Sequence, residues 1–271
     1  MLELSSALKK KGYLITISSD SDKIETVDKD TDLVIRSADV ENGHPEVEAA
    51  RKNGIEVISF TEFIARQTKN KTRVVIRENR VGGQILPIVC FVLRKKNILY
   101  DVASVNAIYG EEQHIQLSYD ARIALLDGER ELNAPMGDKI PYLYNPHILV
   151  MPRFQWIKDK PFETPDLYLN FHKKLIASIE RDGKFIFNET YPALQMLGDS
   201  VREDVTALPY KIPQIQVNPT DTEVETRYGK ITVNTTDEND IADIFAAELV
   251  CKQLGVKSSD FFSLLGEYRF K

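Results

Sequence analysis

Apolar runs alternate with amphipathic stretches along the first seventy residues. Hydrophobic positions at helical spacing predict short helices, and compact blocks of apolar and β-branched residues predict strands between them. The expected helices are LELSSALKKKG (2–12), HPEVEAARKNG (44–54) and a third that starts at Thr61, and the expected strands are YLITIS (13–18), DLVIRS (32–37) and IEVISF (55–60). Strands and helices that alternate through short connections predict a small parallel sheet.

A second and larger set of elements follows the basic segment QTKNKT (67–72), which we interpret as a hinge between two domains. The expected strands are RVVI (73–76), ARIALL (121–126), PHILVM (146–151) and KFIFN (184–188), and the expected helices are ILPIVCFVLRKKN (85–97) and TPDLYLNFHKKLIASIERDG (164–183). Strands without polar alternation are typical of a parallel sheet covered by helices on both faces. The second domain is therefore expected to contain such a sheet.

The pattern changes after residue 207. Residues 208–235 contain short segments typical of antiparallel strands, with a hairpin turn expected at Tyr228, Gly229 and Lys230. The helix ENDIADIFAAELVCKQLG (238–255) is expected to end the ordered pattern. The fold class is thus α/β, with a small parallel domain in 1–70 and a larger one in 71–271 that has a parallel sheet flanked by helices and a small antiparallel region. Beyond residue 255, large apolar residues predict a segment that packs on the body or mediates self-association (Phe261, Phe262, Leu264, Leu265 and Phe270).

Length and charge narrow the function classes. A chain of 271 residues favours two domains, and a net charge of -6 argues against nucleic acid as a partner. The sequence has neither a long apolar span nor a leader pattern, so we expect a cytoplasmic protein without a membrane partner. Cys90 and Cys251 lie in apolar helical runs and are expected to be buried free thiols.

The candidate chemistry starts at the loop RENRVGGQ (77–84), which stands between a buried strand and a helix. A phosphate-binding loop has this position, because its backbone N–H groups and the helix N-terminus face the phosphate oxygens. Only Gly82 and Gly83 fit such a loop, which lacks a lysine for the phosphates and a Ser or Thr for magnesium. A plain Gly-Gly turn is the more ordinary interpretation.

Several segments around this loop carry a family resemblance. They are residues 35–76, LLDGEREL (125–132), PYLYNPHILVMPRFQW (141–156), IERDGKFIFN (179–188) and IFAAELVCKQLG (244–255). In this order and spacing the chain resembles the Mur ligases, in the branch that joins UDP-N-acetylmuramate to L-alanine or to a recycled peptide. The resemblance implies a shortened UDP-binding, Rossmann-like domain in 1–70, a central ATPase-type domain in 71–271, and the absence of the C-terminal ligase domain.

The loop departs from the family pattern G-T-H-G-K-T-T. Gly82 stands where the resemblance places the phosphate lysine, and Glu78 directs a carboxylate toward the triphosphate position. The family's metal-binding histidine aligns with Lys158. Its adenine-contacting H-N-x-x-N signature aligns with Asn239, Asp240 and Asp243. These departures imply a degenerate P-loop and no catalytic residues.

Each of the other candidate site residues has a structural explanation as well as a functional one. Ser37 and His44 are candidate UDP-sugar contacts, although His44 before Pro45 is more readily an N-capping residue. Asp127 and Glu129 match two acidic positions of the family and form a candidate weak cation site, with a solvated acidic edge as the alternative.

Three functions remain open on the sequence. The leading hypothesis is a Mur-ligase-like pseudoenzyme of cell-wall (peptidoglycan) ancestry with a binding or scaffolding role and no cofactor. The first alternative is an active ATP-dependent and magnesium-dependent ligase of UDP-N-acetylmuramate with L-alanine or a muropeptide. The second is a structural partner of a full-length paralogue. The expected partners are a UDP-sugar or muropeptide ligand, and a second copy or a paralogue.

Overall fold

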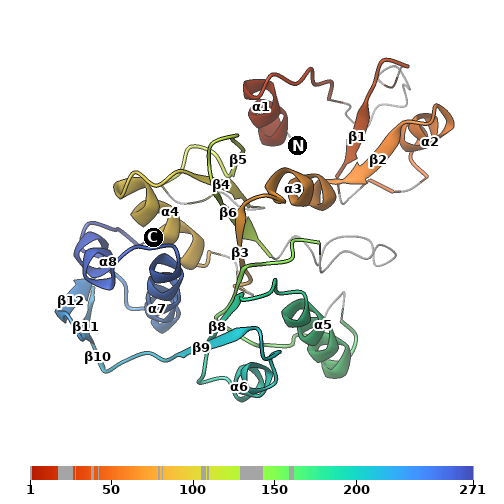
Figure 1. Cartoon of the computed structure of the whole chain (residues 1–271). Helices are drawn as coiled ribbons and strands as arrows, with labels where there is room; N and C mark the ends of the chain where they lie inside the picture. Colours follow the sequence, from red (N-terminus) through yellow and green to blue (C-terminus); the bar gives the residue numbers. More distant parts are fainter. Residues whose placement is uncertain are drawn as a thin grey trace.

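The computed structural model describes residues 2–17, 27, 29–37, 40–41, 43–78, 80, 82–104, 108, 110–128, 143–158 and 162–270. A seven-stranded sheet with the order β5-β4-β6-β3-β7-β8-β9 forms its centre (Figure 1). All neighbouring strands are parallel except β5, which runs antiparallel to β4. The strands are β3 (Thr72–Ile76), β4 (Tyr100–Ala103), β5 (Ile115–Gln116), β6 (Ile123–Asp127), β7 (Ile148–Met151), β8 (Lys184–Asn188) and β9 (Thr206–Tyr210).

Two small sheets accompany the main one. Strands β1 (Leu33–Arg36) and β2 (Glu56–Ser59) pair in parallel near the N-terminus, and β10 (Ile215–Val217), β11 (Thr222–Thr226) and β12 (Gly229–Val233) form an antiparallel meander. The helices are α1 (Leu2–Lys10), α2 (Pro45–Lys52), α3 (Phe60–Thr68), α4 (Ile85–Lys95), α5 (Pro165–Ala177), α6 (Pro192–Asp199), α7 (Glu238–Gln253) and α8 (Ser258–Leu265). The α/β fold class expected from the sequence is confirmed.

Helices cover both faces of the main sheet because its strands alternate their buried side chains. Val74 and Ile76 of β3 belong to a core shared with α4, α7 and α8, whereas Val75 between them faces a second core shared with α1, α3, α5 and α6. Figure 1 shows α4, α7 and α8 gathered on one side of the sheet and α5 on the other. This double cover explains the unbroken apolar strands of the sequence.

Some sequence predictions are corrected by the structure. Residues 13–17 of the expected strand YLITIS form no strand, and Ser18 lies outside the described residues. The helix expected to run to Gly183 ends at Ala177, where Ser178 caps it. The antiparallel region starts later than expected, because residues 206–210 form β9 of the main sheet. Order does not end with α7, since α8 follows it.

The C-terminal segment packs on the body of the protein, which is the first of the two roles that the sequence predicted for it. Helix α8 contacts both α4 and α7, and Phe261, Leu265 and Tyr268 are buried in the first core. Cys90 and Cys251 are buried and free, as expected. Among the described residues, no helix has both the length and the apolar composition needed to cross a membrane.

Candidate functional site

The loop between β3 and α4 lies at the carboxyl edge of the main sheet. Ile76, the last residue of β3, is in register with Asp127 of β6 and Val150 of β7. Gly82 has a φ of 75°, a left-handed conformation that glycine adopts without strain. Open α/β sheets bind their ligands at this edge, next to a helix N-terminus. The fold therefore brings the glycine pair and Asp127 to the edge at which the sequence placed the chemistry.

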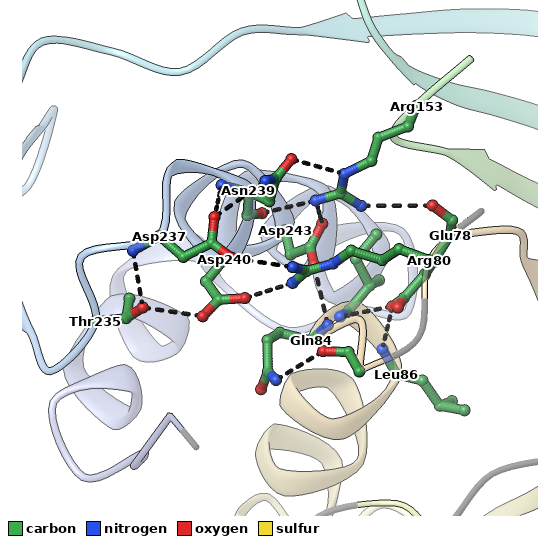
Figure 2. A network of polar contacts seen from close by, with 12 residues as sticks. Glu78, Arg80, Gln84, Leu86, Arg153, Thr235, Asp237, Asn239, Asp240 and Asp243 are labelled. Carbon is green, nitrogen blue, oxygen red and sulfur yellow. Dashed lines mark hydrogen bonds and ion pairs between the residues drawn. The ribbon is translucent and has the colours of Figure 1, made fainter. Parts of the chain in front are cut away.

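Glu78 fills the N-terminus of α4. Its Oε1 accepts hydrogen bonds from the backbone N–H of Ile85 at 2.8 Å and of Leu86 at 3.3 Å (Figure 2). These are first-turn N–H groups, which have no partner inside the helix and which bind phosphate when a helix N-terminus serves as an anion site. The Glu78 carboxylate thus occupies the N–H groups that a phosphate would bind, so it blocks the phosphate position as well as repelling the charge.

Gly83 is fitted to Glu78. A Cβ atom added at Gly83 would lie 1.0 Å from Glu78 Oε2, so every other amino acid would collide with the carboxylate. The Glu78 side chain is buried against this backbone. Gly83 was a predicted remnant of a phosphate loop, and in the structure its lack of a side chain makes room for Glu78.

Arg80 ties the same loop to the start of α7. Its Nη1 donates to Asp237 Oδ2 at 3.2 Å, and its Nη2 donates to Asp243 Oδ2 at 3.0 Å and also to Asp240. Asp237 caps α7, and Asp240 and Asp243 follow at intervals of three residues, so neighbouring members of the row lie close together. Figure 2 shows Arg80 reaching across to this acidic face. Part of the acidic charge at the start of α7 is therefore paired within the chain.

Arg153, which follows β7, holds α7 from the other side. Its Nη2 donates to Asp243 Oδ1 at 2.8 Å and to the carbonyl oxygen of Asn239 at 2.9 Å, and its Nε donates to Asn239 Oδ1 at 3.0 Å. Asp243 is fully buried and also accepts from the backbone N–H of Gln84 at 3.0 Å. Sequence reasoning missed Arg80 and Arg153, because the row of acids at i, i+3 and i+6 indicates a need for cationic partners but does not say which residues supply them.

The C-terminal segment reaches the loop as well. Tyr268 donates its hydroxyl hydrogen to Gln84 Oε1 at 2.8 Å, and Gln84 Nε2 donates to the carbonyl oxygen of Gly82 at 3.0 Å. The loop is thus fixed by β7, α7 and the residues after α8.

Two buried carboxyl groups face each other in this network. Burial, and then the charge of Asp243, raise the pKa of Glu78 well above its ordinary value. Burial also raises the pKa of Asp243, against the attraction of Arg153. The proton affinity of Glu78 is therefore higher in the folded chain than in the unfolded one.

Replacement of Glu78 by glutamine is expected to change how stability depends on pH. Because the folded-state pKa is raised, the folded chain binds more protons than the unfolded chain between the ordinary and the raised value, so the Glu78 contribution destabilises as pH rises through that window. Glutamine keeps the acceptor oxygen and does not titrate. Urea unfolding from pH 4.5 upward should give a stability difference, Glu78→Gln minus wild type, that grows with pH. A difference that is constant with pH would contradict the buried carboxyl.

The remaining predicted site residues lie apart from this network. Asp127 Oδ2 accepts from Ser104 Oγ at 3.1 Å, and Glu129 lies outside the described residues. Ser37 directly follows β1, and His44 Nδ1 accepts from the backbone N–H of Glu46 at 3.4 Å, which is the N-capping role. These contacts assign no ligand role to Ser37 or His44, so both stay predictions.

The described residues at the N-terminus of α4 do not fit the phosphates of the nucleotide that the fold implies. Glu78 fills the helix N-terminus, and Lys158, at the position of the metal-binding histidine, is exposed. In the part of the chain that the structure describes, no three His, Cys, Asp or Glu side chains gather as a metal site would need. The prediction of a cation site at Asp127 and Glu129 remains open.

The parallel sheet, the glycine loop at its carboxyl edge and α4 behind the loop define an α/β protein whose central sheet is covered by helices on both faces. A family model described as "Mur ligase family, catalytic domain" matches residues 3–72. The chain shares the fold of the Mur ligases, as the sequence resemblance implied. No curated protein sequence matches the chain.

Solved structures of Mur and muropeptide ligases are similar to the chain over most of its length. The UDP-N-acetylmuramate:L-alanyl-gamma-D-glutamyl-meso-diaminopimelate ligase from Neisseria meningitides has a TM-score of 0.74 at 12% identity, over 88% of this chain and 79% of that one. A murein peptide ligase from Psychrobacter arcticus has 0.72 at 13%, over 98% and 60%. The UDP-N-acetylmuramate–alanine ligase from Thermotoga maritima has 0.71 at 14%, over 99% and 61%. The chain thus spans about 60% of the length of the last two.

Proposed function

We propose that this chain is a non-ligating relative of the peptidoglycan precursor ligases, with a binding or scaffolding role. The observation that carries the proposal is the Glu78 carboxylate bound to the N-terminus of α4. Phosphoryl transfer depends on positive charge and N–H donors around the transferred phosphate. Here the donors are taken by a carboxylate, and Gly82 supplies no charge.

The loop is also held in this state from several directions. Arg80 and Gln84 bind the loop to Asp243 of α7, and Arg153 contacts both Asp243 and the carbonyl oxygen of Glu78. An active ligase, the alternative hypothesis, would have to break this buried network before it could accept ATP.

A UDP-sugar or muropeptide remains the proposed ligand for the N-terminal part of the chain. The family model covers residues 3–72, and Ser37 stands at the carboxyl end of β1, where sheets of this kind bind ligands. Thermal-shift measurements with UDP-N-acetylmuramate, with wild type and Ser37→Ala compared, test this contact. Self-association or pairing with a paralogue stays a prediction that sedimentation can check.

We expect no ATP hydrolysis. We also expect the dissociation constant for ATP to be about 1 mM or higher, which corresponds to a binding free energy of about 4 kcal/mol or less. Calorimetry and phosphate release with magnesium measure both quantities. The variant Glu78→Gly/Gly82→Lys should bind ATP more tightly than wild type, because it frees the α4 N–H groups and adds a cation. Glu203→Gly, an exposed position in the turn before β9, is the control. Hydrolysis by wild type that Asp127→Asn abolishes would contradict the proposal.

A further inference from the structure

A hollow of about 450 Å³ lies at the amino edge of the main sheet, at the opposite ends of the strands from the Gly82 loop. It forms where three neighbouring strands begin, because Thr72 opens β3, Arg122 precedes β6 and His147 precedes β7. The segment that joins α3 to β3 supplies the rest of the wall. The lining residues are Lys69, Asn70, Lys71, Thr72, Arg122 and His147.

The hollow has an excess of positive charge. No carboxylate is among its described lining residues. The charge of Lys71 is compensated, because its Nζ donates to Asp101 Oδ2 at 2.6 Å and to the Ser118 carbonyl oxygen at 2.7 Å. Lys69 and Arg122 are exposed, and neither forms an ion pair within the described residues. In a chain with a net charge of -6, Lys69 and Arg122 beside this acid-free wall give a local excess of positive charge.

His147 adds a neutral donor to this wall. Its Nδ1 accepts from the backbone N–H of Arg73 at 3.2 Å, so the proton of the neutral ring is on Nε2. Burial and the charge of Arg73 lower the pKa of His147, which keeps the ring neutral at pH 7. A lysine, an arginine and neutral N–H and O–H donors together are the groups with which proteins bind phosphate oxygens.

A second hollow of about 490 Å³ adjoins the first and shares Asn70, Lys71 and Arg122 with it. Its wall includes the ring of Tyr119, which is exposed and has Lys11 Nζ at 4.1 Å from its centroid. This wall also carries one acid, Asp120. The first hollow therefore suits the anionic end of a ligand, and the second offers an aromatic surface to its organic part.

We propose that the two hollows bind a phosphorylated small molecule, with its phosphate at Lys69 and Arg122 and its organic part at Tyr119. Such a ligand joins the linker between α3 and β3 to the starts of β6 and β7. This proposed site lies away from the glycine loop, and the proposal does not depend on the proposed loss of ligase activity.

The test is a calorimetric titration of the full chain with phenyl phosphate and with inorganic phosphate at constant ionic strength. Wild type should bind phenyl phosphate at least tenfold more tightly than inorganic phosphate. The variant Lys69→Gln/Arg122→Gln should weaken both by tenfold or more. Tyr119→Ser should remove only the preference for phenyl phosphate. All three positions are exposed, so these variants should fold.

Lys173→Gln, an exposed lysine on α5, is the matched control and should bind both probes as wild type does. The proposal is wrong if wild type binds neither probe, if the double variant binds as tightly as wild type, or if the control loses as much affinity as the double variant. Equal affinity for the two probes would overturn the assignment of an organic ligand and leave a site for free phosphate.

Discussion

Removal of residues 256–271 is expected to give a chain that does not fold. The segment buries six large apolar side chains in the core shared with α4 and α7: Val256, Phe261, Phe262, Leu265, Tyr268 and Phe270. Each such side chain contributes about 1.5–3 kcal/mol when it is buried, and their sum reaches the about 5–15 kcal/mol by which a whole domain is stable. Circular dichroism and a thermal melt measure the outcome, and an unchanged melting temperature would contradict it.

A point variant tests the same packing in the full chain. Phe261 is fully buried, with its ring centroid 5.3 Å from that of Phe262 in an edge-on contact. Phe261→Ala should lower the free energy of unfolding by about 3–5 kcal/mol. Leu99→Ala is the control, because this apolar side chain is 66% exposed and its loss should cost less than about 0.5 kcal/mol. Equal losses in the two variants would show that α8 does not pack as described.

The sequence predicted the elements that have a strong local signal. Helix α2 begins at Pro45 and is followed by Gly54 with a φ of 73°, and helix α3 begins with a capping box between Ser59 and Glu62. Such starts and stops are encoded within a few residues. The strands of the sheet centre were predicted because burial on both faces leaves an uninterrupted apolar run.

Elements with a weak local signal were missed. Helix α6 has eight residues and no capping side chain, and β5 has two residues. Strand β9 begins with exposed or half-buried residues and pairs with β8 alone in the main sheet. Short or edge elements form because a neighbour already provides hydrogen-bond partners and an apolar surface. That information lies in the tertiary structure and not in their own residues.

The position of the candidate loop could be predicted from the sequence, but the contacts that its side chains make could not. The loop after β3, its glycine pair and the repulsive Glu78 were identified, because a strand, a glycine loop and a helix form a local pattern. The pairing of Arg80 with acids about 160 positions away was not, because no spacing rule joins residues so distant in sequence. The contact of Glu78 with α4 is local, but it was missed because only the folded backbone shows where a carboxylate points.

Replacement of Asp243 by alanine is expected to destabilise the protein by about 3–5 kcal/mol, because it leaves buried positive charge without its partner. Asp243 is fully buried between Arg80 and Arg153 and accepts the Gln84 backbone N–H, so the variant leaves donors of three residues without this partner. Urea unfolding at pH 7 measures the loss. The control is Asp237→Ala, whose side chain is 47% exposed and caps α7, and its cost should be about 1 kcal/mol.

The double variant Arg153→Met/Asp243→Ala tests whether the loss of stability in Asp243→Ala comes from an unpaired charge or from a cavity. If the loss comes from an unpaired buried charge, the double variant should be less destabilised than the sum of the two single variants. If the losses add, the charge pairing is not what stabilises the loop. Hydrogen exchange supplies the link to the site: the amides of Ile85 and Leu86, which donate to Glu78, should lose protection in Asp243→Ala and keep it in Asp237→Ala. Unchanged protection in both would mean that Glu78 stays on α4 without the help of α7.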